Sequence, residues 1–154
     1  MTFCPLSEIR SPRLHEFAAY LSGKRQGDAP IRRDSLDPPV EIPRLIGGML
    51  MIEKIRDRVP HAGRFRVRLV GSNLAAMAER DYTGKWLDEV AMDVNLTSPI
   101  EELHMIFAAS EVFSGVRVLP WRMRSHIVVE WVAAHLTTDP DMNELVMFVF
   151  DKQP

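Results

Sequence analysis

Cysteine is almost absent from this chain of 154 residues, which has one, Cys4. A single cysteine excludes an internal disulfide and any metal site built from several thiolates, and it suits a reducing cytoplasm. No apolar run is long enough for a membrane span, and residues 1–10 lack the basic and apolar regions of a signal peptide. The formal net charge of −2 argues against general binding to nucleic acid or acidic membranes. We therefore expect a cytoplasmic protein whose partners are neither nucleic acid nor membrane.

Catalytic signatures are lacking as well. The chain contains no G-x-S-x-G, no phosphate-binding glycine loop, no dinucleotide-binding fingerprint and no H-E-x-x-H. Glu101, Glu102 and His104 stand close together on one segment, but the second set of ligands that a carboxylate metal site needs is missing. The sequence therefore predicts neither an enzyme nor a metal site.

The chain is organised around residues 64–90, RFRVRLVGSNLAAMAERDYTGKWLDEV. Apolar residues at every second position over 65–69 alternate with arginines, which is the period of a half-buried strand. Gly71 ends this strand, and Ser72 is expected to cap a short helix. Gly84 then stands in a turn that favours a positive φ, before a second short apolar run.

Upstream, the pattern predicts a helix, a long connection and a strand. Ser11 followed by proline is typical of a helix N-terminus. An apolar stripe at helical spacing follows, formed by Leu14, Phe17, Ala18 and Leu21. Residues 23–43 are rich in proline and turn residues, so we expect an extended connection with at most one helical turn, and then a strand over 49–55. The pattern therefore divides the chain into two parts. Residues 1–44 form a helix and a connection that pack on the domain, and residues 45–154 form the domain itself.

Downstream, Ser98, Pro99 and Glu101 form a capping-box signature. A helix is expected from Pro99 to near Gly115. Its apolar face is predicted to contain Ile100, Leu103, His104, Phe107 and Ala108. The remainder fits three strands, over residues 116–123, 127–136 and 144–150.

The motifs in this order resemble a PAS-like family of short, often free-standing bacterial proteins. The resemblance is carried by R-F-R-x-R-L-V-G at 64–71, D-x-T-G at 81–84 and L-D-E at 87–89. It extends upstream through R-x-D-S-L-D-P at 32–38 and I-P-R-L at 42–45. It implies an α+β fold, with a PAS-like five-stranded antiparallel sheet, helices between strands two and three, and here an added N-terminal amphipathic helix.

The resemblance also implies a function. A PAS domain would act as a stand-alone sensory or signalling module that binds an unidentified small molecule or a partner protein. Because the chain has no kinase, cyclase or DNA-binding segment of its own, the signal would pass to another protein. The strand over residues 127–136 is apolar on both faces and needs cover on both sides. The N-terminal helix with Leu14, Phe17 and Leu21, a second subunit in a homodimer, or both could supply the outer cover.

The ligand is not named by the sequence. Pocket-lining candidates are Trp86, His104, Met105, Phe107 and Trp121, although such residues are more often plain core. One alternative makes the protein a haem-binding gas or redox sensor with His104 as axial ligand. The other interpretation of His104, which the sequence favours, is a buried histidine of the core. A flavin–cysteine adduct is not expected, because Cys4 lies outside the core.

Two further alternatives stay open. Arg64, Arg66 and Arg68 could bind an anionic ligand or partner, whereas the default for the polar side of a strand is a solvated face. A small α+β enzyme with a cavity enclosed by its sheet could use His104 or Asp81 as general base.

Overall fold

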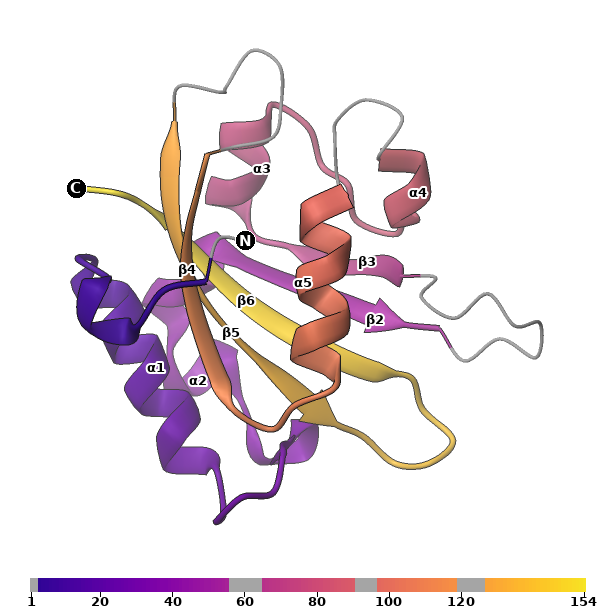
Figure 1. The fold of residues 1–154 in the computed structure, drawn as a ribbon. Helices are drawn as coiled ribbons and strands as arrows, with labels where there is room; N and C mark the ends of the chain where they lie inside the picture. Colours follow the sequence, from indigo (N-terminus) through magenta and orange to yellow (C-terminus); the bar gives the residue numbers. More distant parts are fainter. Residues whose placement is uncertain (1–2, 56–64, 91–96, 119–126) are drawn as a thin grey trace.

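A mixed sheet of six strands forms the centre of the part of the chain that the computed structural model describes, residues 3–55, 65–90, 97–118 and 127–154 (Figure 1). The strands are β1 (Ile31–Arg32), β2 (Met49–Lys54), β3 (Phe65–Val70), β4 (Val112–Val118), β5 (Val128–Thr137) and β6 (Glu144–Lys152). The α-helices are α1 (Pro12–Lys24), α2 (Pro38–Glu41), α3 (Ser72–Ala78), α4 (Leu87–Val90) and α5 (Thr97–Phe107). Three short 3₁₀ helices are η1 (Leu6–Glu8), η2 (Arg33–Ser35) and η3 (Pro43–Gly48). The α+β class is confirmed.

The order across the sheet is β3, β2, β6, β5 and β4, with every neighbouring pair antiparallel. The two-residue β1 adds a parallel pair at the end of β5, where Ile31 lies opposite Leu136. β5 therefore has three partners, and eight consecutive residues of it, Val129–Leu136, are buried. The sequence pattern of a strand apolar on both faces reflects this central position.

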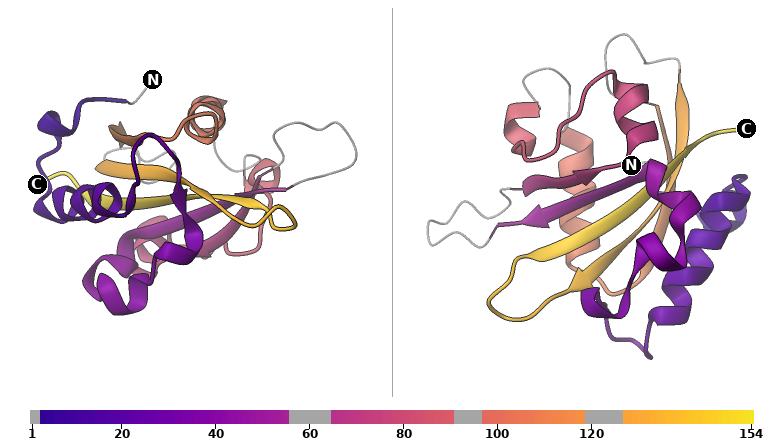
Figure 2. Two further views of the ribbon diagram at one scale, coloured as in Figure 1. Left: turned by 90° about the horizontal axis from the view of Figure 1, so that it is seen from below. Right: turned by 180° about the vertical axis from the view of Figure 1, so that it is seen from behind.

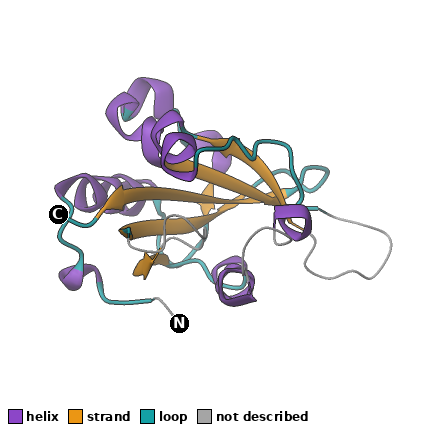
Figure 3. Cartoon of the chain, turned by 90° about the horizontal axis from the view of Figure 1, so that it is seen from above, coloured by secondary structure: helices purple, strands orange, loops and turns teal. Residues whose placement is uncertain are grey.

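Both faces of the sheet are covered by helices, as Figures 2 and 3 show. α1 packs on one face with Leu14, Phe17, Ala18 and Leu21, all buried, against the side chains of alternate residues of β5 and β6. α4 and α5 pack on the other face with Leu87, Leu103, Ile106 and Phe107. The expected amphipathic cover helix is confirmed, since its apolar stripe is the buried one.

The N-terminus of α1 follows the sequence closely. Ser11 is the N-cap, and its side-chain oxygen accepts the backbone N–H of Leu14 at 3.3 Å, with Pro12 at the first helical position. Upstream of it, Cys4 donates its backbone N–H to the carbonyl of Ser114 in β4 at 3.0 Å. Phe3 and Cys4 therefore lie along β4, upstream of α1.

Three expectations about element boundaries were wrong. α5 begins at Thr97 and ends at Phe107, not near Gly115, because residues 112–115 pair with β5 and belong to β4. β4 accordingly starts at Val112, four residues before the predicted 116, and the expected strand end beyond residue 118 lies outside the described residues. Residues 23–43 contain β1, η2 and α2, more structure than the expected connection with at most one helical turn.

α3 also differs at its start, since Gly71 and not Ser72 is its N-cap. A Cβ atom on Gly71 would lie 2.3 Å from the carbonyl oxygen of Ile46, so the position admits glycine alone without rearrangement. Gly84 has a φ of +82°, as the turn pattern predicted. None of the helices in the described ranges combines the length and apolar character needed to cross a membrane.

Candidate functional site

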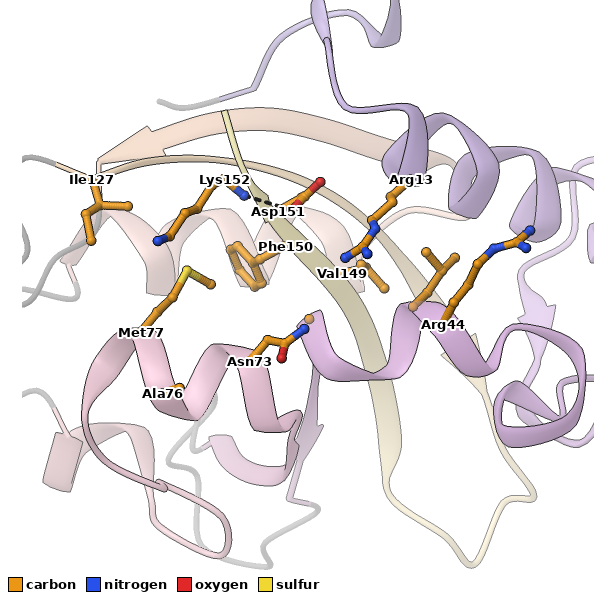
Figure 4. A pocket seen from close by; sticks show the side chains of 12 residues that line it. Arg13, Arg44, Asn73, Ala76, Met77, Ile127, Val149, Phe150, Asp151 and Lys152 are labelled. Atoms are coloured by element: carbon orange, nitrogen blue, oxygen red, sulfur yellow. Dashed lines mark hydrogen bonds between the residues drawn. The ribbon is translucent and has the colours of Figure 1, made fainter. Parts of the chain in front are cut away.

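A pocket of about 410 Å³ lies where the last residues of β6 pass between α1 and the η3–α3 segment (Figure 4). Its wall comes from five parts of the chain. The lining residues are Arg13 of α1, Arg44, Leu45 and Gly48 of η3, Asn73, Ala76 and Met77 of α3, Ile127, and Val149, Phe150, Asp151 and Lys152 of β6.

The pocket exists because β6 is longer than its neighbour β2. The pairing of these two strands ends with Met49 opposite Val149, whereas Phe150–Lys152 pair with β5 alone. The free edge of β6 therefore faces the cavity. Gly48 closes one end of it, where a Cβ atom would lie 2.3 Å from the carbonyl oxygen of Phe150. This close backbone approach explains why η3 ends in glycine.

Among the described residues, the lining carries three cationic side chains and one carboxylate. Arg44 forms an ion pair with Glu16, and the hydrogen bond from Arg44 lowers the pKa of that carboxyl group. Asp151 accepts the Ser11 hydroxyl at 2.7 Å. Arg13 makes no side-chain hydrogen bond or ion pair with another described residue, and neither does Lys152. With Arg44 paired to Glu16 and Asp151 counted against Arg13 and Lys152, the described lining keeps an excess of one positive charge.

The side chain that ties α1 to the sheet lies next to this pocket. Glu130 of β5 is completely buried, and its carboxylate accepts the backbone N–H of Ser11 at 2.8 Å and that of Arg10 at 3.0 and 3.1 Å. Asp151 lies opposite Glu130 in the β5–β6 pair and holds the Ser11 hydroxyl. Sequence reasoning assigned no role to Glu130, although a single acidic residue inside an apolar strand was a usable signal.

The expected ligand residues do not line this pocket. Phe107 is buried in the core, with its ring stacked on Phe65 at 5.5 Å between centroids. Trp86 is half-buried, and the guanidinium of Arg66 lies 5.6 Å from its ring centroid. Met105 is 43% exposed. Trp121 lies outside the described residues.

The expectation that His104 is a buried core residue was wrong. α5 turns Leu103, Ile106 and Phe107 inward, whereas His104, at the edge of the contact between α5 and the sheet, and Ala108 are exposed. The ring of His104 meets the edge of Phe65 at 5.2 Å between centroids. The haem alternative through His104 stays a prediction, now for a histidine at the surface.

The three arginines expected on one strand, Arg64, Arg66 and Arg68, do not share one environment. Arg66 forms an ion pair with Glu53, directly opposite in β2 and buried, so this arginine has a structural partner. Arg68 is exposed and forms no side-chain hydrogen bond or ion pair with another described residue, and Arg64 lies outside the described part of the chain. An anion-binding face formed by all three stays a prediction.

The remaining candidates for chemistry are engaged in structural contacts or exposed. Asp81 accepts the backbone N–H and the hydroxyl of Thr83 at 2.9 and 2.6 Å. These hydrogen bonds lower the pKa of Asp81 and so weaken it as a general base. Glu102 is buried in an ion pair with Arg117, whereas Glu101 is exposed. Over the described ranges, no three His, Cys, Asp or Glu side chains gather in a group that could hold a metal.

In comparisons with known proteins, no protein family, no curated protein and no solved structure matches this chain.

Proposed function

We propose that the protein is a PAS-like sensory or signalling module that binds a small molecule and relays the change to a partner protein. The strand order supports the PAS-like part of the proposal. Strands β2 to β6 form an antiparallel sheet in the order β3, β2, β6, β5 and β4, and α3, α4 and α5 lie between β3 and β4 in the sequence. The motif resemblance implies helices between the second and third strands of a five-stranded antiparallel sheet, so this order supports the proposal, with β1 as an addition.

The observation that carries the ligand-binding part is the pocket between α1, η3, α3 and β6. Its volume of about 410 Å³ is in the size range of small-molecule sites, roughly 300 to 1,000 Å³. A ligand there would contact the first turn of α1 through Arg13 and the end of the sheet through Phe150 and Lys152.

The route for a signal follows from the attachment of α1. Asp151 lines the pocket and also accepts the hydroxyl of Ser11, the N-cap of α1. A ligand that changes the position of Asp151 or Arg13 acts directly on the start of this helix. A ligand shifts a conformational equilibrium only through different affinities for its two states, and here those states would differ in how α1 is seated.

The test is hydrogen–deuterium exchange on the purified protein before and after removal of any retained small molecule by unfolding and refolding. We expect faster exchange at residues 10–15 in the stripped protein, with little change in β2 and β3. Identical exchange in a sample known to have lost a ligand would contradict the proposed relay. The absorbance spectrum of the same sample tests the haem alternative, which predicts a Soret band.

A further inference from the structure

We infer that the pocket binds a small organic anion, with its carboxylate or phosphate group at one of the two wall cations, Arg13 or Lys152, and its apolar part against Phe150 and Met77. The inference deepens the proposed function and rests on it, because it names the chemical class of the ligand for the same pocket.

Two cations of the pocket wall form no ion pair with a described residue. Arg13 comes from the first turn of α1 and Lys152 from the end of β6, and their side chains flank Phe150 in Figure 4. With Asp151 counted, the described lining keeps an excess of one positive charge, in a chain whose net charge is −2. An oxyanion is the ligand group that a guanidinium or an ammonium group recognises, and the guanidinium can bind it through two N–H groups at once.

Two other features of the wall favour the same ligand group. Asn73 carries a side-chain amide that can donate to an oxygen atom. Arg13 lies in the first turn of the 13-residue α1, an end of the helix where the dipole favours negative charge and where the carboxylates of Glu130 and Asp151 already lie. Asp151 is the one acidic residue in the lining, and its carboxylate accepts from the Ser11 hydroxyl and from the backbone N–H of Lys152 at 3.0 Å.

The apolar part of the ligand is inferred from the other side of the cavity. Met77 faces the pocket from α3, and Phe150 lies at its centre in Figure 4. Phe150 is partly buried, with its ring stacked on Phe148 at 5.5 Å between centroids, so one ring face is fixed. A flat or aliphatic group is the natural partner for these side chains. A free inorganic ion would leave them uncovered.

The test compares small ligands that share one ring and differ in charge. Binding of benzoate, phenyl phosphate, benzyl alcohol, benzylammonium and inorganic phosphate is measured by calorimetry on the full chain. We expect benzoate or phenyl phosphate to bind about tenfold or more tightly than benzyl alcohol, because charge-assisted hydrogen bonds are about twice as strong as neutral ones. The better of the two distinguishes a carboxylate from a phosphate ligand. Inorganic phosphate should bind more weakly than phenyl phosphate.

Variants locate the binding. Arg13→Gln or Lys152→Gln should weaken binding of the preferred anion about fivefold or more, and the variant with the larger loss identifies the cation that holds the anionic group. Both melting temperatures should stay unchanged, because neither side chain forms a hydrogen bond or ion pair with another described residue. Lys85→Gln is the matched control, an exposed cation outside the pocket, and should leave the affinity unchanged. Arg68→Gln tests the competing site on β3.

Several outcomes would overturn the inference. Equal affinities for benzyl alcohol and the anions would remove the role of charge. Loss of binding in Arg68→Gln, with Arg13→Gln and Lys152→Gln unaffected, would move the site to β3. Binding of the neutral or the cationic compound alone would refute the anion and leave the proposed ligand-binding module standing. No binding of any compound, together with no small molecule retained by the purified protein, would overturn both.

Discussion

Replacement of Glu130 perturbs the contact that fixes where α1 begins. This side chain is completely buried, and its two oxygens accept the backbone N–H groups of Arg10 and Ser11 at 2.8 to 3.1 Å. Glu130→Gln preserves the size of the side chain but converts one acceptor oxygen into an NH₂ group that faces a donor. A hydrogen bond to a charged group contributes about 1.5 to 3 kcal/mol, and a buried N–H without an acceptor costs about 1 to 3 kcal/mol.

The expected loss in the free energy of unfolding is therefore roughly 2 to 4 kcal/mol, since part of the geometry survives in the amide. For a chain of this length the melting temperature should fall by roughly 5 to 15 °C. Thermal and urea unfolding followed by circular dichroism measure the change. Glu101→Gln, an exposed glutamate on α5, is the control and should stay within about 0.5 kcal/mol of the wild type. A wild-type melting temperature for Glu130→Gln would refute the reasoning, and so would an equal loss in the control.

Three further predictions follow from single residues. Gly84→Val should lower the free energy of unfolding by about 1 to 3 kcal/mol, because the φ of +82° at this position is strained for a β-branched residue. The cost is one of backbone strain alone, since no atom lies within 4 Å of the Cβ position, and equal urea midpoints for variant and wild type would contradict it. His104→Ala should cost less than about 1 kcal/mol because the ring is exposed, and a larger loss in urea unfolding would place it in the core after all. The pKa of Glu41 is lowered to about 2, chiefly by its hydrogen bond from Lys24, so its contribution is complete above the ordinary pKa of 4.5 and is lost as the pH falls towards about 2. The melting temperature of Glu41→Gln should therefore fall less between pH 4.5 and about 2 than that of the wild type. The same pH dependence in both proteins would contradict a stabilising contact between Glu41 and Lys24.

The elements that the sequence predicted well are those set by local signals. The start of α1 depends on Ser11 and a proline beside it, and the buried stripe has the helical period. The alternation over 65–69 placed β3, and the turn at Gly84 adopted its expected φ. These features involve residues within a few positions of one another, so that a single stretch carries the information.

The features that were missed depend on partners far away in the chain. α5 ends at Phe107 because β4 pairs with β5 from Val112 onward, and nothing within residues 99–115 signals that pairing. The two residues of β1 form a strand through the end of β5 alone. His104 was misplaced for a related reason, because the width of the apolar face of α5 did not decide which side meets the sheet.

The candidate site was beyond sequence reasoning for the same physical cause. Its lining residues come from α1, η3, α3 and β6, and Arg13 and Lys152 stand near opposite ends of the chain. In the sequence, each of these two residues has the pattern of an ordinary surface cation. Their significance arises when the free edge of β6 brings them to one cavity.

Native mass spectrometry of the purified wild type beside the double variant Arg13→Gln/Lys152→Gln tests the central claim most directly. The account predicts that the wild type carries a small molecule whose mass and fragments identify a carboxylate or phosphate, and that the double variant, equally folded by circular dichroism, lacks it. The same molecule retained equally by both proteins would contradict the claim, because the pocket cations would then have no part in binding.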